Sequence, residues 1–145
     1  MQVAGGTYHV TSRGNRRQSI YHDDDDRRWF LAQRDRIVAR CGWRLHSYCL
    51  MNNHFHLLIE TPRPNLSAGM QRLKCEYAAY FNARHLLEGH LFKQRFDSRL
   101  IESEDHLDEV LRYIALNPVR AGLCEHPSEW PWSSFYDATR LVYDR

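Results

Sequence analysis

The sequence predicts an α+β fold of the ferredoxin-like type, also described as split βαβ or RRM-like. It consists of an antiparallel sheet with helices on one face and an appended C-terminal helix. The expected elements follow the order strand, helix, strand, strand, helix, strand, which is the split βαβ pattern, and a third helix comes after them. The length of 145 residues suits one domain. We therefore expect a single domain over residues 1–145, with the first and third strands at the centre of its sheet.

The first strand and the first helix are expected near the N-terminus. Residues 6–13 alternate apolar and polar side chains and are rich in β-branched residues, as a strand requires. From residue 24 to residue 41, apolar side chains recur at helical spacing, and Gly42 ends the pattern. The acidic run Asp23–Asp26 lies where a helix N-terminus favours negative charge, and it lacks the spacing of a calcium-binding loop. We assign this run to structure.

The next two strands form a predicted hairpin. Residues 43–51 and 54–60 are strand-like runs rich in apolar and aromatic side chains. Asn52 and Asn53 join them, and both residues tolerate the geometry of a tight turn.

The second half of the chain adds a helix, a strand and a further helix. Apolar positions follow a three-to-four period over residues 66–85, which predicts the second helix. The basic and aromatic run 91–101 is expected to be a strand. Ser103 is a good N-cap for the third helix, and Pro118 is expected to end it. Residues 119–145 are expected to form an irregular flap that packs on the body.

Composition and charge exclude several classes of protein. With 43% hydrophobic and 26% charged residues, the chain is neither collagen-like, nor of low complexity, nor wholly disordered. A net charge of +2 does not by itself indicate a nucleic-acid partner. No apolar run approaches the roughly 18 residues of a membrane-spanning helix, and no signal segment follows Met1, so we expect a cytoplasmic protein. The cysteines form no C-x-x-C pair and are expected to be free and mostly buried.

His54 and His56 are the first candidates for a functional site. Side chains two apart on a strand project from one face, while Phe55 enters the other. Neutral imidazole binds divalent transition metals, and two ligands from one strand leave positions open for water or substrate. The alternative is a half-buried structural histidine with chance spacing. The setting favours the metal interpretation, because two polar rings on an otherwise apolar strand need partners.

Tyr113 and Asn117 are the next candidates. Four residues apart on a helix, they share a face, so a phenol and an amide could meet one metal site. The early turns of this helix are acidic, and therefore only its late turns suit a substrate that carries phosphate. The alternative places Tyr113 in a buried stripe with Val110 and Ile114, and makes Asn117 a cap before Pro118. From spacing alone, this alternative is favoured.

Positive charge is clustered although its total is small. One cluster lies near the N-terminus without an acidic neighbour, and another precedes the third helix. These clusters alternate with aromatic, Asn and Gln side chains, as a surface for phosphates and stacked bases requires. Solvated faces of ordinary loops and helices are the alternative. The residues we assign to contacts with a nucleic-acid backbone are Arg13, Arg16, Arg17, Lys93 and Arg95.

Five ordered segments span nearly the whole chain: TSRGNRRQ, LMNNHFHLLIE, YFNARH, GHLFKQRF and RYIALNPVRAGL. Together they resemble the REP-associated tyrosine transposases, relatives of the single-strand transposases of small bacterial insertion sequences within the HUH endonuclease class. Five segments in this order are far more specific than a lone H-x-H pair.

The resemblance implies roles for the candidate residues. His54 and His56 would be paired metal ligands, and Tyr113 would be the nucleophile on a catalytic C-terminal helix. Asn117 would be a further ligand. Mg²⁺ or Mn²⁺ held there would polarise the scissile phosphate, and attack by Tyr113 would give a 5′-phosphotyrosine and a free 3′-hydroxyl. The expected function is a metal-dependent, single-stranded DNA endonuclease and strand transferase that acts near hairpin-forming repeats, as a monomer or homodimer.

Two other classes of function remain open. The same sheet architecture serves RNA-binding domains, so a catalytically silent nucleic-acid-binding module is one alternative, although RNP-type aromatic signatures are missing. A small oxygenase or hydrolase that uses two histidines and a carboxylate is the other. A covalent adduct with a hairpin oligonucleotide, lost in Tyr113→Phe, separates the transposase from both.

Overall fold

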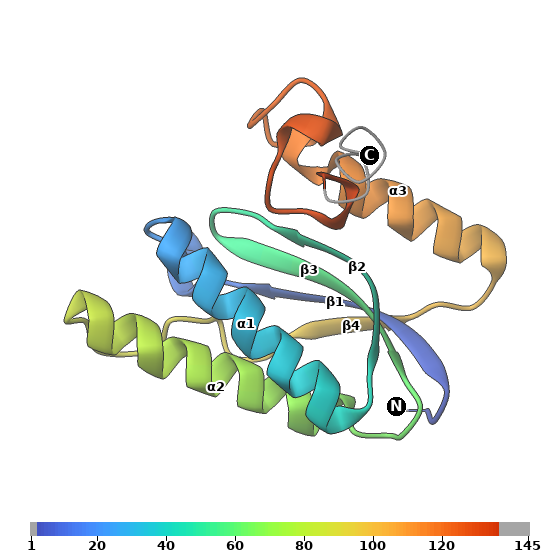
Figure 1. The fold of residues 1–145 in the computed structure, drawn as a ribbon, viewed down its shortest axis with the longest axis horizontal. Coiled ribbons are helices and arrows are strands. Elements are labelled where there is room, and N and C mark those ends of the chain that lie inside the picture. The colour runs from blue at the N-terminus through green and yellow to red at the C-terminus, as the bar shows by residue number, and fades with distance from the viewer. Residues whose placement is uncertain (1–2, 137–145) are drawn as a thin grey trace.

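The computed structural model describes residues 3–136, and its elements follow the expected order (Figure 1). The elements, of which η1 and η2 are short 3₁₀ helices, are β1 (Gly6–Arg13), η1 (Asn15–Arg17), α1 (Asp24–Cys41), β2 (Arg44–Leu50), β3 (His54–Thr61), α2 (Leu66–His85), β4 (Asp97–Leu100), α3 (Glu104–Arg120) and η2 (Pro127–Glu129). The bounds predicted for the first strand and the first two helices are confirmed.

The sheet has four strands in the order β2-β3-β1-β4, and every neighbouring pair is antiparallel. β1 and β3 therefore hold the central positions, as the split βαβ pattern predicts. The hairpin between β2 and β3 turns at Asn52 and Asn53, where the Met51 N–H donates to the His54 carbonyl at 2.8 Å. The ferredoxin-like α+β class is confirmed.

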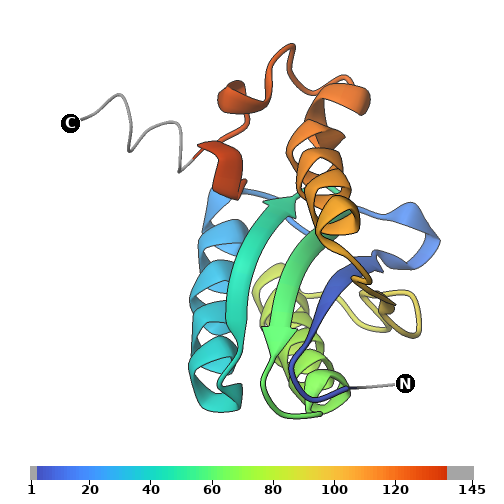
Figure 2. The ribbon, with the colours of Figure 1, turned by 90° about the vertical axis from the view of Figure 1, so that its right-hand side faces the viewer.

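α1 and α2 cover one face of the sheet, and α3 crosses the opposite face (Figures 1 and 2). The alternation of β3 explains these layers, because Phe55 and Ile59 are fully buried in the main core with α1 and α2. The other face of β3 carries His54, His56 and Leu58, and Leu58 packs in a small cluster with α3. α3 therefore lies over the imidazole face. Within the described residues, no helix has the length and apolar character needed to cross a bilayer.

The strand predicted over residues 91–101 is wrong in length, because β4 spans only Asp97–Leu100. Leu91 and Phe92 both pack into the main core. Neighbouring residues of a strand face opposite sides, so a segment that buries two consecutive side chains in one core does not continue the sheet. The segment before β4 is instead a loop that meets Gly14 through a single bridge at Phe92.

Pro118 does not end the third helix, since α3 continues to Arg120 with the proline inside its last turn. A proline removes one backbone donor, and near a helix end this costs only one hydrogen bond. The Ala121 N–H, at the C-cap, bonds to the Asn117 carbonyl at 3.0 Å and closes the last turn. The predicted start is confirmed, because the Ser103 side chain caps α3.

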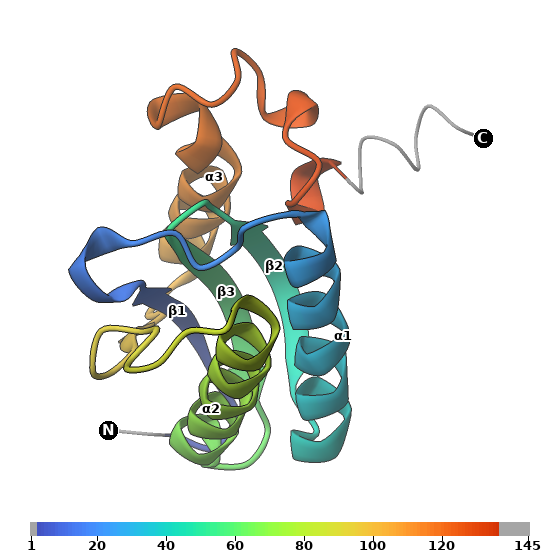
Figure 3. The same cartoon turned by 90° about the vertical axis from the view of Figure 1, so that its left-hand side faces the viewer.

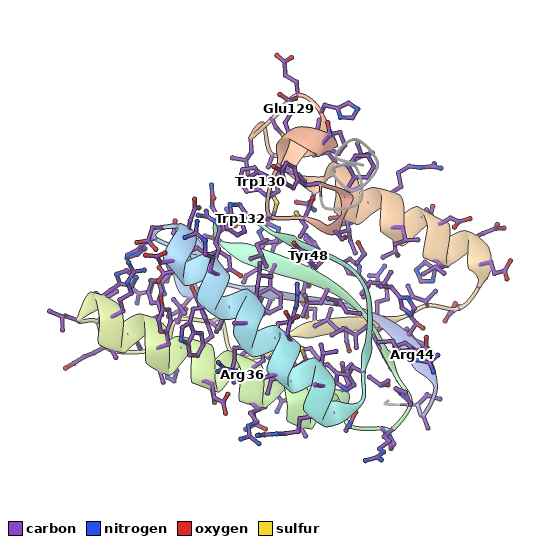
Figure 4. All side chains as sticks on the ribbon, in the orientation of Figure 1. Arg36, Arg44, Tyr48, Glu129, Trp130 and Trp132 are labelled. Carbon is purple, nitrogen blue, oxygen red and sulfur yellow. The ribbon has the colours of Figure 1, made fainter. Side chains whose placement is uncertain are left out.

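The flap expected over residues 119–145 begins only after α3, and its residues 137–145 lie outside the described residues. The described part packs along β2 (Figure 4). The Leu50 N–H donates to the Trp132 carbonyl at 2.8 Å, and the Trp130 indole N–H donates to the Leu50 carbonyl at 2.9 Å. These bonds cover part of the edge strand of the sheet.

The cysteines Cys41, Cys49, Cys75 and Cys124 are all free, as predicted, but the expectation that most are buried is wrong. Only Cys49 is buried, and burial raises the pKa of its thiol to about 12. Cys75 is exposed, because it lies on the side of α2 that faces away from the core formed by Leu73 and Tyr77.

The acidic run at the start of α1 serves structure, as predicted. The Asp23 side chain accepts a hydrogen bond from the Asp26 N–H at 3.0 Å and caps the helix. Asp26 is fully buried, and its carboxylate lies 3.0 Å from the Tyr80 hydroxyl, 2.6 Å from Arg84 and 2.8 Å from His85. Burial opposes its ionisation, but the hydrogen bonds it accepts prevail and hold the pKa of Asp26 below its ordinary value.

Asp26→Asn is expected to destabilise the fold by about 2–4 kcal/mol, because Arg84 and His85 lose a buried anionic partner. Folding lowers the pKa of Asp26, so its stabilisation is present above the pKa of unfolded aspartate, about 3.9, and is lost as the pH falls below it. Urea unfolding of both proteins across this range measures the effect. If the free energies of unfolding of wild type and variant differ by the same amount at every pH down to about 3, the expected role of Asp26 is contradicted.

Candidate active site

His54 and His56 lie on the face of β3 that α3 crosses, and their ring centroids are 5.0 Å apart. Phe55 between them is buried in the core on the opposite face. The alternation of the strand therefore brings both imidazoles to one place, as the sequence predicts.

The His54 ring is held from two sides. Its Nδ1 lies 2.7 Å from Asn53 Oδ1, and a hydrogen bond joins the ring to the Asn117 side chain of α3. Because an amide oxygen only accepts, Nδ1 carries the proton and Nε2 keeps its lone pair. Burial lowers the pKa of His54 to about 4, the charge of Arg13 acts in the same direction, and the Asn117 bond acts against them. The ring is therefore neutral near pH 7, the form that binds metal ions.

The His56 ring is 3% exposed and is more deeply enclosed. Its Nδ1 lies 3.0 Å from Nε2 of His9 on β1. Its own Nε2 is buried and has no hydrogen-bond partner in the part of the chain that the structure describes. Burial lowers the pKa of His56 to about 2, and His54 and His9 add smaller effects in the same direction. A neutral imidazole with one buried, unpaired nitrogen is a donor that a metal ion satisfies.

Tyr113 of α3 lies beside these rings, with its ring centroid 5.8 Å from His56 and 5.9 Å from His9. It is 47% exposed, whereas Val110 and Ile114 on the same helix are 7% and 0% exposed. The interpretation that places Tyr113 in the buried stripe is therefore wrong. The phenol lies at the border of the packed face, in contact with the histidines and open to solvent.

Arg120 is a part of the site that the sequence analysis missed. Its guanidinium carbon lies 4.2 Å from the centre of the Tyr113 ring, and its Nη2 donates to the Tyr113 carbonyl at 2.5 Å. Stacked and hydrogen-bonded in this way, Arg120 holds the backbone and ring of Tyr113 together. Arg120 follows Tyr113 by about two helical turns, which places both on one face. The sequence analysis ended the helix at Pro118, and it therefore did not place Arg120 on the same helix as Tyr113.

His9 is the second residue that was missed. Tyr8 and Val10 on either side of it are buried in the main core, so His9 faces α3. The alternation of β1 was visible in the sequence. What was not visible is the register in which β1 pairs with β3, which brings His9 to His56.

The two basic clusters lie side by side. The Lys93 N–H donates to the Arg13 carbonyl at 2.8 Å, and Gly14 bridges to Phe92. Figure 3 shows the segment that follows β1 beside the loop that precedes β4. One surface therefore combines both clusters, and Arg13 joins it to the histidines, whose pKa values its charge lowers.

Arg16 and Arg17 project from this surface on a constrained backbone. Their φ angles are 54° and 59°, in the left-handed region that costs a non-glycine residue about 1 kcal/mol. Both side chains are exposed, and neither forms an ion pair with another described residue. The surface thus presents positive charge that the described part of the protein does not neutralise.

His54, His56 and Asn117 form a donor set that fits a divalent cation. The unpaired Nε2 of His56 is the observation that supports this fit. Asn117 is 8% exposed, lies inside α3 and bonds through its side chain to the His54 ring, so it is not the cap of the helix. Among the described residues, no group of three or more His, Cys, Asp or Glu side chains is arranged to hold a metal ion, so none of them adds to His54 and His56 the carboxylate that the oxygenase or hydrolase alternative requires.

Comparison with known families identifies the chain. Residues 2–117 match the family described as "Transposase IS200 like". The chain belongs to this transposase family. The matched residues include His54, His56, Tyr113 and Asn117 and end before Arg120.

A curated relative agrees with this family assignment. A protein of Haemophilus influenzae that is named as a REP-associated tyrosine transposase is 29% identical over an alignment of 107 residues, and the match covers 66% of this chain. The matched part spans 61% of the length of that relative.

Solved structures confirm the fold of the chain. A REP-associated tyrosine transposase bound to a REP hairpin superposes with a TM-score of 0.82 at 21% identity, over 99% of this chain and 85% of the other. A transposase from Deinococcus radiodurans superposes with a TM-score of 0.56 at 20% identity, over 79% of this chain and 89% of the other.

Proposed function

We propose that this chain is a metal-dependent, single-stranded DNA endonuclease and strand transferase that acts near hairpin-forming repeats through a 5′-phosphotyrosine intermediate. One observation carries the proposal. The half-exposed phenol of Tyr113 lies against the buried, neutral ring of His56, which in turn contacts His54. Membership of the transposase family supports it.

The residues of the chain account for the cleavage step. The phenolic oxygen of Tyr113 attacks the scissile phosphorus, an O–P bond to Tyr113 forms, and the bond from phosphorus to the 3′-oxygen breaks. The phenol gives up its proton and the 3′-oxygen gains one, so a free 3′-hydroxyl is released. Attack of a 3′-hydroxyl on the phosphotyrosine reverses the step and joins strands. The phosphodiester energy is conserved, and no nucleotide cofactor is needed.

His54, His56 and Asn117 would hold Mg²⁺ or Mn²⁺. When bound, the ion polarises the scissile phosphate and offsets the negative charge of the transition state. These donors carry no charge, and the positive charges of Arg13 and Arg120 act on His56. The protein alone therefore attracts a cation weakly, and an anionic phosphate in the site compensates. Metal binding and DNA binding should be coupled.

The affinity for Mn²⁺ is expected to rise at least about tenfold when an oligonucleotide is bound. Titration calorimetry of Tyr113→Phe protein, which cannot attack the strand, measures this affinity with and without a hairpin oligonucleotide, and a titration of the oligonucleotide alone is the control. By linkage, Mn²⁺ tightens DNA binding by the same factor. Equal Mn²⁺ affinities with and without the oligonucleotide would contradict the coupling.

An unpaired strand beside a hairpin is the proposed substrate. One structural neighbour is a transposase bound to a REP hairpin. In this chain, the basic surface around Arg13 and Lys93 adjoins the histidines and offers positive charge to a DNA backbone. A scissile phosphate in an unpaired strand reaches Tyr113 more readily than one in an intact duplex.

Replacement of both Arg16 and Arg17 by Ala is expected to weaken DNA binding and to reduce the slope of log K against log salt by about 1.4 to 1.8, since each contact releases counterions. Arg36→Ala with Arg40→Ala is a matched control. Both residues lie on α1, which covers the face of the sheet opposite to the one that carries His54 and His56 (Figure 4). Fluorescence anisotropy at several salt concentrations gives the slopes. An unchanged slope in the Arg16 and Arg17 variant would show that this placement of the DNA is wrong.

A cleavage assay tests the proposed function. The protein is incubated with Mn²⁺ and a hairpin oligonucleotide that has unpaired flanks, and the products are separated on a denaturing gel. We expect a protein–DNA adduct and a free strand that ends in a 3′-hydroxyl. Tight binding without an adduct would overturn the proposal and favour the catalytically silent nucleic-acid-binding module.

A further inference from the structure

His9 lies in the site, but the proposed chemistry gives it no role. It lies on β1, where the register pairs Thr11, two residues further along and on the same face of the strand, with His56 of β3. The His9 and His56 rings stack with centroids 5.2 Å apart and an interplanar angle of 25°. Their facing nitrogens, Nε2 of His9 and Nδ1 of His56, are 3.0 Å apart. The His9 and Tyr113 rings also lie edge to face, with centroids 5.9 Å apart.

A hydrogen bond between two neutral imidazoles has two possible directions. If Nδ1 of His56 donates, the single N–H of that ring is on Nδ1 and bonds to His9, and Nε2 keeps a lone pair. If Nε2 of His9 donates instead, His56 must carry its proton on Nε2. That nitrogen is buried and has no acceptor among the described residues, so the proton would occupy the position that a cation needs.

The proposed metal site selects the first direction, because only that direction leaves a lone pair on the buried, unpaired Nε2 of His56.

We propose that His9 is a positioning residue, whose Nε2 accepts the Nδ1–H of His56 and so keeps His56 in the tautomer that presents Nε2 as a ligand. The inference rests on the proposed function, since it assigns His56 as a ligand. It goes beyond that function, because it names the residue that decides which nitrogen of His56 is available. Partners of this kind typically change metal affinity by about 10- to 100-fold.

Two variants separate a positioning role from simple packing. His9→Phe keeps a flat ring against His56 but has no acceptor. His9→Gln places an amide oxygen near the position of Nε2 and restores the acceptor. His46→Phe is the matched control, because His46 is a β2 histidine whose ring nitrogen pairs with Glu60. Circular dichroism and thermal unfolding check that all three proteins fold.

The first measurement needs neither metal nor DNA. Long-range ¹H–¹⁵N NMR spectra of protein labelled in its histidine rings report which nitrogen of His56 is protonated. We expect the Nδ1–H form in wild type and in His9→Gln, and a mixture of tautomers in His9→Phe. An Nε2–H form of His56 in wild type would overturn the proposal whatever the protein does with metal.

The second measurement is the Mn²⁺ affinity of the same proteins with a bound hairpin oligonucleotide, in a Tyr113→Phe background that prevents cleavage. His9→Phe should weaken binding by about 10- to 100-fold, while His9→Gln and His46→Phe stay within about threefold of their parent. Equal affinity in His9→Phe would overturn the proposal. If wild type binds no Mn²⁺ at all, the proposed metal chemistry fails, and the NMR result still decides whether His9 sets the tautomer.

Discussion

Tyr113→Phe is expected to abolish cleavage and the covalent adduct, a loss of at least about 10⁴-fold in rate. Phenylalanine retains the ring that contacts His9, His56 and Arg120, but it lacks the attacking oxygen. The fold and the basic surface should be unchanged, so the affinity for a hairpin oligonucleotide should stay within about threefold. Single-turnover cleavage of an end-labelled oligonucleotide on denaturing gels measures the rate, and anisotropy measures binding.

Tyr80→Phe is the matched control for this prediction. Tyr80 is a tyrosine of α2, which covers the other face of the sheet, and its hydroxyl bonds to Asp26. Its removal should lower stability without a comparable loss of cleavage. Cleavage that persists in Tyr113→Phe at the wild-type rate would assign the nucleophile to another group.

His56→Ala is expected to reduce cleavage by about 10²- to 10³-fold with DNA binding largely retained. The substitution removes the buried Nε2 that has no partner among the described residues, together with the hydrogen bond to His9. His54→Ala should act in the same direction, since both rings present a neutral nitrogen to one place. Cleavage is measured at saturating DNA over a series of Mn²⁺ concentrations.

His46→Ala is the control for the histidine variants, because its half-exposed ring pairs with Glu60 and does not contact the site. The variants should be compared well below their unfolding temperatures, since removal of a fully packed ring leaves a cavity. If His56→Ala cleaves DNA as fast as His46→Ala at every Mn²⁺ concentration, the imidazole pair has no part in the reaction.

Local periodicity was sufficient to predict most of the fold and the pair of histidines. The alternation of residues 54–60 identified the face that His54 and His56 share, because alternation is a property of the strand alone. The same kind of argument located α1 and α2, whose apolar residues repeat within each helix. These features depend on neighbours in sequence, and the sequence contains them directly.

The rest of the site depends on how the elements pack. Tyr113 lies next to the buried Ile114 on α3, at the border of the face that packs on the sheet, and helical spacing alone does not report where that border falls. His9 meets His56 only because β1 pairs with β3 in one register. Arg120 reaches Tyr113 because α3 continues past Pro118, which lies in the last turn, where a proline costs only one hydrogen bond.

The loop before β4 also depends on packing, and here the local sequence predicted a strand that the packing does not allow. Its residues resemble a strand in composition, but Leu91 and Phe92 are both held in the main core. The loop therefore turns toward Gly14 and brings Lys93 next to Arg13. The basic surface was predicted as separate clusters, and only the packing of this loop joins them.

Identification of the residue that carries the DNA tests the central claim most directly. Wild-type protein is incubated with Mn²⁺ and a hairpin oligonucleotide, digested with protease and nuclease, and sequenced by tandem mass spectrometry, while end-labelling determines the termini of the released strand. The account predicts one modified peptide, in which Tyr113 bears a 5′-linked phosphate, and a released strand that ends in a 3′-hydroxyl. A nucleotide attached to any other residue, or cleavage that leaves two free ends and no modified peptide, would contradict it.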